Sequence, residues 1–316
     1  MIVALAGGVG GAKLSQGLAT ALPPGDLTVI VNTADDLQLF GLRISPDLDT
    51  VMYTLAGLAN PVTGWGILGD THNTLAGISG YGRNIWFQLG DRDFATHILR
   101  TERLRQGATL TEVTAELAVA LGVTSKIIPM ANECVATKIQ TPSELLDFQE
   151  YFVGRRQQEH VTGIVFAGIE EAVPSPGLLD SIETADLIVF CPSNPLVSTG
   201  PILAVAGITE ALRGSKAPVI AVSPIIGGKA LKGPADKMMS TLGHDVSALG
   251  VARMYAGIVD GMVIDQTDEG LAVEIEALGM QVLATQIIMG DTNDRKRLAL
   301  EIITFGSSLI PAKASI

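Results

Sequence analysis

The sequence predicts an α/β protein with a Rossmann-like, doubly wound, mostly parallel sheet and a helical insertion. Two observations support this fold class. Short apolar runs rich in β-branched residues alternate along the chain with segments of helical periodicity, and most runs end in a Gly, Pro, Ser or Asn cluster. The chain also opens with a buried strand, a glycine-rich turn and a helix, the order found at the start of nucleotide-binding sheets.

The expected strands follow one another along the whole chain. After the opening strand in MIVALA, the apolar runs are 27–31, 126–130, 163–167, 187–191, 219–222, 262–264 and 281–284. Because parallel strands need crossover connections, the helical segments between these runs are expected to cover both faces of the sheet.

Residues 57–122 interrupt this alternation. Loops rich in Gly and Trp are followed there by helical segments and by no clear strand. One helix, LTEVTAELAVAL, is preceded by Thr109 and contains Glu112, the spacing of a capping box. We therefore predict that residues 1–56 and 123–316 form a nucleotide-binding core, and that residues 57–122 form a helical insertion acting as a lid or second lobe.

A formal net charge of −12 on 316 residues limits the partners of the chain. The acidic balance disfavours nucleic acid and anionic membranes, so small-molecule substrates are expected, with no nucleic acid and no membrane as partners. The chain opens without a secretory leader, and no apolar run reaches the roughly 18 residues of a membrane span, which predicts a cytoplasmic protein. A mean hydropathy of +0.38 favours a homodimer.

The cysteines and histidines offer no recognisable chemistry. Cys134 and Cys191 lack CxxC spacing and are expected to be reduced thiols. His72 and His97 are isolated and lack the spacing of metal ligands, so structural roles are expected for both.

The turn GGVGGAKL after the opening strand predicts a phosphate site. Glycine lets the backbone pass close to a phosphate, and the following helix N-terminus offers free N–H groups and a positive dipole end. The spacing departs from the dinucleotide fingerprint, whose third glycine is Lys13 here, and from a Walker A loop, because alanine precedes Lys13 and leucine follows it. The alternative is a glycine-rich turn without a ligand. The residues assigned to nucleotide or phosphate binding are Gly8, Gly10, Gly11 and Lys13.

Acidic residues follow the second strand and open the next helix. In open parallel sheets, ligands bind beyond the carboxyl ends of the strands. VNTADD places Asp35 and Asp36 beside the glycine turn, where they could hold Mg²⁺ or a ribose hydroxyl, or belong to a solvated turn or helix cap. In ISPDLDTV, Ser45 is expected to cap a helix with Pro46 at its first position, and Asp49 either supports that helix start or projects into the cleft.

Three further segments offer polar or cationic groups. GDRD places Arg92 at a helix start, where its planar fork suits a phosphate or planar ligand, unless it pairs with the neighbouring aspartates. CPSNPL offers Ser193 and Asn194 as hydrogen-bond donors to a base or phosphate. VSPIIGGKALKGPADK places Lys229, Lys232 and Lys237 among glycines in an otherwise acidic protein, where they could offset the charge of a phosphate, and Lys229 is assigned to phosphate binding. A plain turn and a solvated lysine are the alternatives.

Together these segments resemble one family. The blocks GGVGGAKL, VNTADD, ISPDLDTV, GDRDxATHIxR, PSNPxxSxGPI and VSPIIGxxxxxGPAxK are similar to those of the 2-phospho-L-lactate transferase family of coenzyme F-420 biosynthesis. The likeness runs in order across nearly the whole chain, through TPSELLDFQEYFVGRR and MGDTNDRKRLA. Several of these blocks are long and rare, which makes the resemblance specific.

The resemblance implies a Mg²⁺-dependent transferase. Such an enzyme moves a phosphoester acid from its guanosine diphosphate-activated form to the deazaflavin Fo, giving coenzyme F-420-0 or its dehydro form, and GMP. The acid stays open between 2-phospho-L-lactate, phosphoenolpyruvate and phosphoglycerate. The resemblance places the Fo contacts on Asp49 and Arg92, and the guanosine diphosphate on the glycine turn with Lys13 and on the Ser-Asn-Pro loop. Our hypothesis makes Asp49 the group that orients or deprotonates the attacking hydroxyl, with Asp36 as a second catalytic carboxylate and Asp35 and Asp36 as metal ligands.

Two other functions stay open at this point. A UDP-sugar-binding regulatory protein of the related gluconeogenesis-factor family would share the glycine turn and core fold, but such proteins lack the GDRDxATH block that this chain has. A nicotinamide dehydrogenase would use the acidic pair after the second strand, but Lys13 stands where its third glycine belongs and no catalytic His or Tyr is placed.

Overall fold

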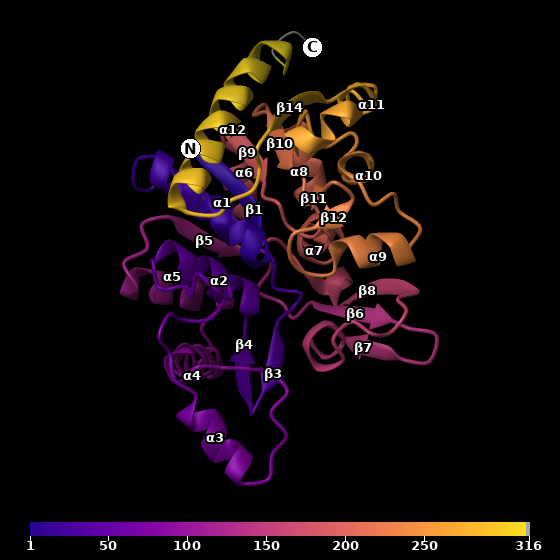
Figure 1. Ribbon diagram of the computed structural model, residues 1–316. Coiled ribbons are helices and arrows are strands. Elements are labelled where there is room, and N and C mark those ends of the chain that lie inside the picture. Colours follow the sequence, from indigo (N-terminus) through magenta and orange to yellow (C-terminus); the bar gives the residue numbers. More distant parts are fainter. Residues whose placement is uncertain (314–316) are drawn as a thin grey trace.

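The computed structural model describes the backbone of residues 1–313 and the side chains of residues 1–309. Its centre is a seven-stranded sheet in which every neighbouring pair is parallel (Figure 1). The strands are β1 (Ile2–Ala6), β2 (Leu27–Val31), β5 (Lys126–Pro129), β9 (Leu187–Phe190), β10 (Val219–Val222), β13 (Gly261–Asp265) and β14 (Gln281–Thr285). Their order across the sheet is β14-β13-β10-β9-β1-β2-β5. The predicted α/β fold class is confirmed.

The direction of strand addition reverses between β1 and β9. The first part of the chain adds β2 and β5 on one side of β1, whereas the later strands extend from β9 on the other side. In such sheets the loops that follow the two strands at the reversal diverge and leave a crevice, and ligands bind there. The loops at this crevice are the glycine turn after β1 and the segment that begins at Pro192 after β9.

Alternating side chains of β1 show why helices cover both faces. Val3 and Leu5 belong to one buried core and Ile2, Ala4 and Ala6 to another, because successive side chains of a strand point to opposite faces. The first core is covered by α6 (Leu178–Glu183), α7 (Gly200–Ala204), α8 (Ile208–Gly214), α9 (Ala235–Thr241), α10 (Ala248–Met254) and α11 (Ala272–Glu276). The second is covered by α1 (Gly8–Ala21), α2 (Pro46–Leu55), α5 (Leu110–Ala120) and α12 (Thr292–Lys313).

One predicted strand joins a different sheet. The run at 163–167 forms β8 (Gly163–Ala167), which pairs antiparallel with β6 (Ala136–Gln140) in a small sheet that also contains β7 (Leu145–Asp147). The expectation that this run belongs to the parallel sheet was wrong. Strands of a parallel sheet are buried on both faces, whereas β8 is only partly buried, so its apolar run reflects packing on one side.

Further short elements complete the chain. Two antiparallel hairpins pair β3 (Leu37–Leu39) with β4 (Leu42–Ile44), and β11 (Ile225–Ile226) with β12 (Lys229–Ala230). The remaining short helical turns are η1 (Glu150–Gly154), η2 (Ile169–Glu171), η3 (Pro195–Thr199) and η4 (Gln266–Leu271).

Residues 57–122 contain α3 (Asn73–Gly80), α4 (Asp91–Arg105) and α5. The predicted capping box is confirmed, because the Thr109 hydroxyl accepts from Glu112 N–H while the Glu112 carboxylate accepts from Thr109 N–H. α5 packs in the same core as α1, α2 and α12, whereas Leu75 and Phe94 pack with the β3–β4 hairpin in a separate cluster. The division into core and insertion, and the role of this segment as a lid, stay predictions.

No single helix among the described residues is both long and apolar enough to span a membrane. Pro195–Ala204 and Ile208–Gly214 meet the length and hydropathy of a span only when taken together, across a bend of 86°.

Gly17 provides a test of how α1 packs against α12. A Cβ at Gly17 would lie 2.2 Å from the carbonyl oxygen of Arg295, whereas a Cβ at Gly77 in α3 would meet open space. We expect Gly17→Ala to lower the free energy of unfolding by about 1–3 kcal/mol through overpacking. The control Gly77→Ala should raise it by about 0.5–1 kcal/mol, because alanine favours helix. Denaturant titration measures both, and equal effects of the two changes would contradict this packing.

Candidate active site

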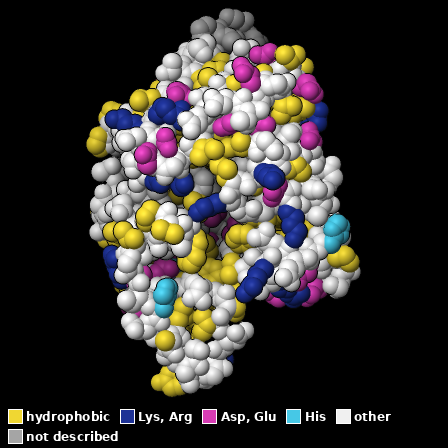
Figure 2. Space-filling view, in the orientation of Figure 1, with side chains coloured by type: hydrophobic (Ala, Val, Ile, Leu, Met, Phe, Trp, Pro, Cys, Tyr) yellow, Lys and Arg dark blue, Asp and Glu magenta, His cyan; other side chains and the backbone are white. Residues whose placement is uncertain are grey.

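A cavity of about 650 Å³ opens at the crevice between β1 and β9. Figure 2 shows a hollow near the middle of one face, with Lys and Arg side chains at its rim and acidic side chains within it. Of the residues predicted from the sequence, those that line the cavity are Gly8, Gly10, Lys13, Asp35, Asp49, Ser193 and Asn194. Those that do not line it are Gly11, Asp36, Arg92 and Lys229.

The glycine turn fits directly against the loop after β9. Gly7 N–H donates to Ser193 Oγ at 3.0 Å, and the same hydroxyl donates back to the Gly7 carbonyl at 2.8 Å. A Cβ at Gly10 would lie 2.2 Å from the Pro192 carbonyl oxygen, and one at Gly11 would lie 2.8 Å from Ser193 Oγ. These glycines are therefore required by the packing of two loops, in addition to any approach to phosphate.

Asp35 and Asp47 form a pair of buried carboxylates that line the cavity. Asp47 accepts from Gly8 N–H at 2.8 Å and from Asn32 Nδ2 at 3.0 Å, whereas Asp35 Oδ1 is buried and has no hydrogen-bond partner within the described part of the chain. Burial, and then the charge of Asp47, raises the pKa of Asp35 well above its usual range. Burial likewise raises the pKa of Asp47 to about 6.

This pair suits a hard divalent cation. Mg²⁺ prefers carboxylate oxygens, and a cation would satisfy the unpartnered oxygen of Asp35 while offsetting the repulsion between the two carboxylates. Asp47 was not predicted from the sequence, because a carboxylate in the first turn of a helix is already explained by the helix dipole. The sequence feature that could have indicated Asp47 is the acidic block PDLD, which also contains Asp49.

Asp36 is turned away from the cavity. Its Oδ2 accepts from Ser45 Oγ at 2.7 Å and pairs with Arg43 Nη2 at 3.0 Å. Burial raises the pKa of Asp36 to about 6, although the charge of Arg43 opposes the shift. Ser45 precedes α2, as predicted, but its hydroxyl makes no capping bond because it donates to Asp36.

A second charged cluster lies where α2 meets α4. Both oxygens of Asp49 pair with the guanidinium of Arg100, Oδ2 at 3.0 Å from Nη1 and Oδ1 against Nη2. The Arg100 side chain is only 1% exposed. Burial alone would lower the pKa of Arg100, but the charge of Asp49 raises it above its ordinary value. The side chain of Asp49 is thus held in place by a buried cation.

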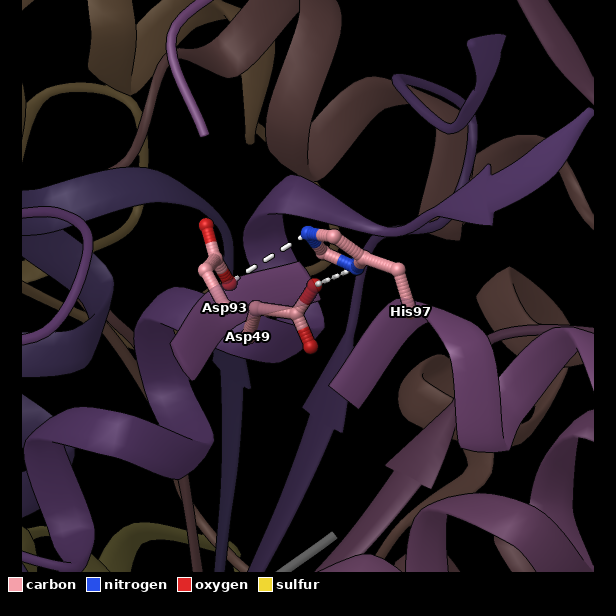
Figure 3. Close-up of side chains that lie close together, drawn as sticks. All are labelled: Asp49, Asp93 and His97. Carbon is pink, nitrogen blue, oxygen red and sulfur yellow. Dashed lines mark ion pairs between the residues drawn. The ribbon is translucent and has the colours of Figure 1, made fainter. Parts of the chain in front are cut away.

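The two ring nitrogens of His97 face two acidic residues, Asp49 and Asp93 (Figure 3). Its Nδ1 is 3.6 Å from Asp49 Oδ2, and its Nε2 is 3.3 Å from Asp93 Oδ1. Asp93 Oδ1 also accepts from the Tyr53 hydroxyl at 2.8 Å. One ligand atom from each of Asp49, Asp93 and His97 lies within 4.8 Å of the others, a spacing that fits a metal ion. Arg100 already occupies both oxygens of Asp49, however, so Asp35 and Asp47 suit a cation better.

Two lysines at the cavity have no carboxylate partner among the described residues. Lys13 Nζ donates to the Met289 carbonyl at 2.9 Å, and Lys232 Nζ donates to the Thr63 carbonyl at 2.9 Å. Burial, followed by the charges of Arg295 and Lys232, lowers the pKa of Lys13. A phosphate at this position would relieve the repulsion among these cations.

Arg92 and Lys229 lie apart from these groups. Both side chains are exposed, and Arg92 N–H donates to Asp70 Oδ1 at 2.9 Å at the start of α4. Lys232, three residues after Lys229 in the same loop region, reaches the cavity instead.

Curated relatives of this chain are named as transferases. The model of the family described as 2-phospho-L-lactate transferase CofD matches residues 2–303. The phosphoenolpyruvate transferase of Streptomyces griseus is 44% identical over 308 residues, covering 96% of this chain and 97% of that protein. The 2-phospho-L-lactate transferase of Methanosarcina mazei is 40% identical over 298 residues, covering 94% and 98%. Among solved structures, protein BH3568 of Bacillus halodurans has a TM-score of 0.65 at 17% identity, covering 96% and 98%, a likeness of fold alone.

Arg100→Met tests the buried ion pair. Removing the guanidinium leaves Asp49 buried and uncompensated, so we expect the free energy of unfolding to fall by about 3–5 kcal/mol. The control Arg103→Met changes another arginine of α4, whose exposed side chain pairs with Glu116 of α5. This change should affect stability little. Adding Asp49→Leu to Arg100→Met should restore part of the loss, because no unpaired charge remains. Denaturant titration that finds Arg100→Met as stable as Arg103→Met would contradict the role of the pair.

Proposed function

The chain belongs to the 2-phospho-L-lactate transferase family and is a transferase of coenzyme F-420 biosynthesis, and on this basis we propose the reaction that it performs. It transfers a three-carbon phosphoester acid from a guanosine diphosphate-activated donor to the deazaflavin Fo, giving coenzyme F-420-0 or its dehydro form, and GMP. The observation that carries the proposal is one cavity that combines a pair of buried carboxylates with two lysines that have no carboxylate partner among the described residues. The UDP-sugar-binding regulator is not favoured, because the matching family and its similar members are named transferases.

The donor diphosphate is proposed to lie between the glycine turn and the two lysines. Lys13 and Lys232 provide positive charge that no described carboxylate neutralises, and diphosphate carries the complementary charge. Ser193 holds the shape of the turn through its two bonds to Gly7, and Asn194 accepts from Leu196 N–H at 2.9 Å at the start of η3. In this proposal, both residues shape the nucleotide side of the cavity.

The acceptor is proposed to contact the apolar part of the cavity lining. Aromatic and aliphatic side chains contribute to that lining, and they suit a planar ring such as a deazaflavin. They are Trp65, Phe87, Leu89, Phe148 and Phe152. Asp49, held in place by Arg100, lines the same cavity and is retained as a contact to the Fo side. Arg92, exposed in this structure, reaches Fo only if its side chain turns inward.

Mg²⁺ is proposed to bind Asp35 and Asp47, so that Asp47 takes the place in the metal site first given to Asp36. The unpartnered oxygen of Asp35 and the raised pKa of both carboxylates support this choice. Bound there, Mg²⁺ would offset the charge of the donor diphosphate. Asp36 is proposed to fix Ser45 and Arg43, and so the start of α2, rather than to act in catalysis.

The chain itself contributes position and charge to the reaction. A hydroxyl of Fo attacks the phosphorus that carries the acid, and GMP leaves from the opposite side. Phosphoryl transfer of this kind depends on alignment and on neutralising charge more than on covalent participation of the protein. The glycine turn fixes the donor, the lysines balance its charge, and the apolar wall orders the acceptor.

Product analysis tests the proposed reaction. The protein, Mg²⁺ and Fo are mixed with lactyl-2-diphospho-5′-guanosine, or with the corresponding phosphoenolpyruvate or phosphoglycerate donor, and the products are identified by mass spectrometry. We expect GMP and one F-420-0 product in equal amounts from at least one donor, and the donor that reacts fastest identifies the acid. Absence of product from all three, with thermal stabilisation by UDP-N-acetylglucosamine alone, would contradict the proposal.

Two lysines provide matched variants for the same assay. Lys232→Gln removes a cation at the cavity and should lower kcat/KM for the donor by about 10–100-fold. Lys229→Gln removes an exposed cation outside the cavity and should leave kcat/KM within about twofold.

Mg²⁺ binding is tested by thermal unfolding. Saturating Mg²⁺ should raise the Tm of the wild type by about 2–8 °C, because the ion binds the native state alone. Asp35→Asn should remove most of this rise, whereas Asp180→Asn, which changes an exposed aspartate of α6, should keep it. A full rise in Asp35→Asn would show that the ion binds elsewhere.

A further inference from the structure

The attacking hydroxyl in the proposed reaction has to lose its proton. In phosphoryl transfer a positioned carboxylate commonly accepts that proton. Among the described residues, the carboxylates that line the cavity are Asp35, Asp47, Asp49 and Asp93. Their hydrogen bonds differ, and these differences indicate which of them has an oxygen available for the hydroxyl.

Three of the four carboxylates already have hydrogen-bond partners or belong to the proposed metal site. Both oxygens of Asp49 pair with the guanidinium of Arg100, so neither is available to a bound hydroxyl. One oxygen of Asp47 accepts from Gly8 and the other from Asn32. Asp35 lies against Asp47 in the proposed metal site.

Asp93 has one fixed oxygen and one available oxygen. Oδ1 accepts from the Tyr53 hydroxyl at 2.8 Å and lies 3.3 Å from His97 Nε2. Oδ2 accepts no hydrogen bond from any described residue, and Figure 3 shows it pointing away from His97. The side chain is 10% exposed and lines the cavity, so Oδ2 is within reach of a bound acceptor.

The start of α4 holds the backbone of Asp93 in place. Asp93 N–H donates to Asp70 Oδ2 at 3.1 Å, and Arg92 N–H donates to Asp70 Oδ1 at 2.9 Å. Asp91 in turn accepts from the backbone N–H groups of Asn73 and Thr74 at the start of α3. The two helix starts therefore cap one another, and Asp93 occupies a fixed position at the cavity wall.

Tyr53 and His97 complete the surroundings of Asp93. Burial, and then the charges of Asp49 and Asp93, raises the pKa of Tyr53 well above its ordinary value, so its hydroxyl stays a donor. Arg100 Nη1 lies 3.3 Å from His97 Nδ1, and a guanidinium can only donate. In the neutral ring Nε2 therefore carries the proton, and it lies 3.3 Å from Asp93 Oδ1 as a close contact without hydrogen-bond geometry.

We propose that Asp93 accepts the proton of the attacking hydroxyl through Oδ2, and that Tyr53 and His97 are positioning residues that hold Asp93 for this step. The inference rests on the proposed function and assigns a residue that the sequence analysis left without a role. As the hydroxyl oxygen bonds to phosphorus, its O–H bond breaks and the proton passes to Oδ2. The bond from the same phosphorus to the GMP oxygen breaks, and GMP leaves with that electron pair.

Asp93→Asn in the full-length protein tests the assignment. The amide keeps an oxygen for Tyr53 but cannot accept the proton as a carboxylate does, so kcat should fall by about 10²–10⁴-fold. The Kd for Fo, measured by calorimetry without donor, should stay within about threefold. Glu102→Gln removes an exposed carboxylate from the same helix and should leave both values unchanged. A kcat within threefold of the wild type, or equal losses in kcat and Fo binding, would overturn the proposal.

Tyr53→Phe provides an independent readout. Loss of a hydrogen bond to the charged carboxylate should move the acid limb of the kcat profile to higher pH and lower kcat by about 5–50-fold at unchanged Kd for Fo. His97→Asn should likewise lower kcat without weakening Fo binding. An unmoved acid limb in active Tyr53→Phe would overturn the proposal even if Asp93→Asn did not fold.

A wild type that makes no product would overturn the proposed function, and an active wild type with an active Asp93→Asn would overturn this inference alone.

Discussion

The site depends on the close fit between the glycine turn and the loop after β9. At Gly10 and Gly11 a single added carbon would collide with Pro192 and Ser193, and Ser193 exchanges two hydrogen bonds with Gly7. This contact joins two segments that are 186 residues apart in the chain, at the point where strand order reverses. Because the two loops are locked together, the cavity beside them has a defined shape before any ligand binds.

Around that contact, the positive and the negative side chains of the cavity lie in different places. Lys13 and Lys232 donate to backbone carbonyls, whereas the side chains of Asp35 and Asp47 are buried. Like charges brought together without neutralising partners destabilise a protein, and such arrangements are typical of sites that bind charged ligands. A donor with a diphosphate and a divalent cation would complement both groups at once.

In the wall formed by α2 and α4, the charged side chains pair with one another. There Asp49 pairs with Arg100, and Asp93 accepts from Tyr53 and lies 3.3 Å from His97, so each carboxylate of the cluster has a partner within it. Mutual capping of α3 and α4 holds this wall rigid, and a rigid wall can present one free carboxylate oxygen at a set position. The two charged clusters thus suit different parts of a transfer reaction.

The sequence by itself determined the parallel sheet, the glycine turn, the Thr109 cap and the family, because alternating apolar runs, turn residues and rare blocks are local signals. Only the tertiary structure decided that 163–167 pairs outside the main sheet, since an apolar run specifies burial and not a partner. It also decided that Asp47 faces the cavity while Asp36 turns to Arg43. Arg100 meets Asp49 across 51 residues, and the direction of such side chains depends on helix packing that no local pattern contains.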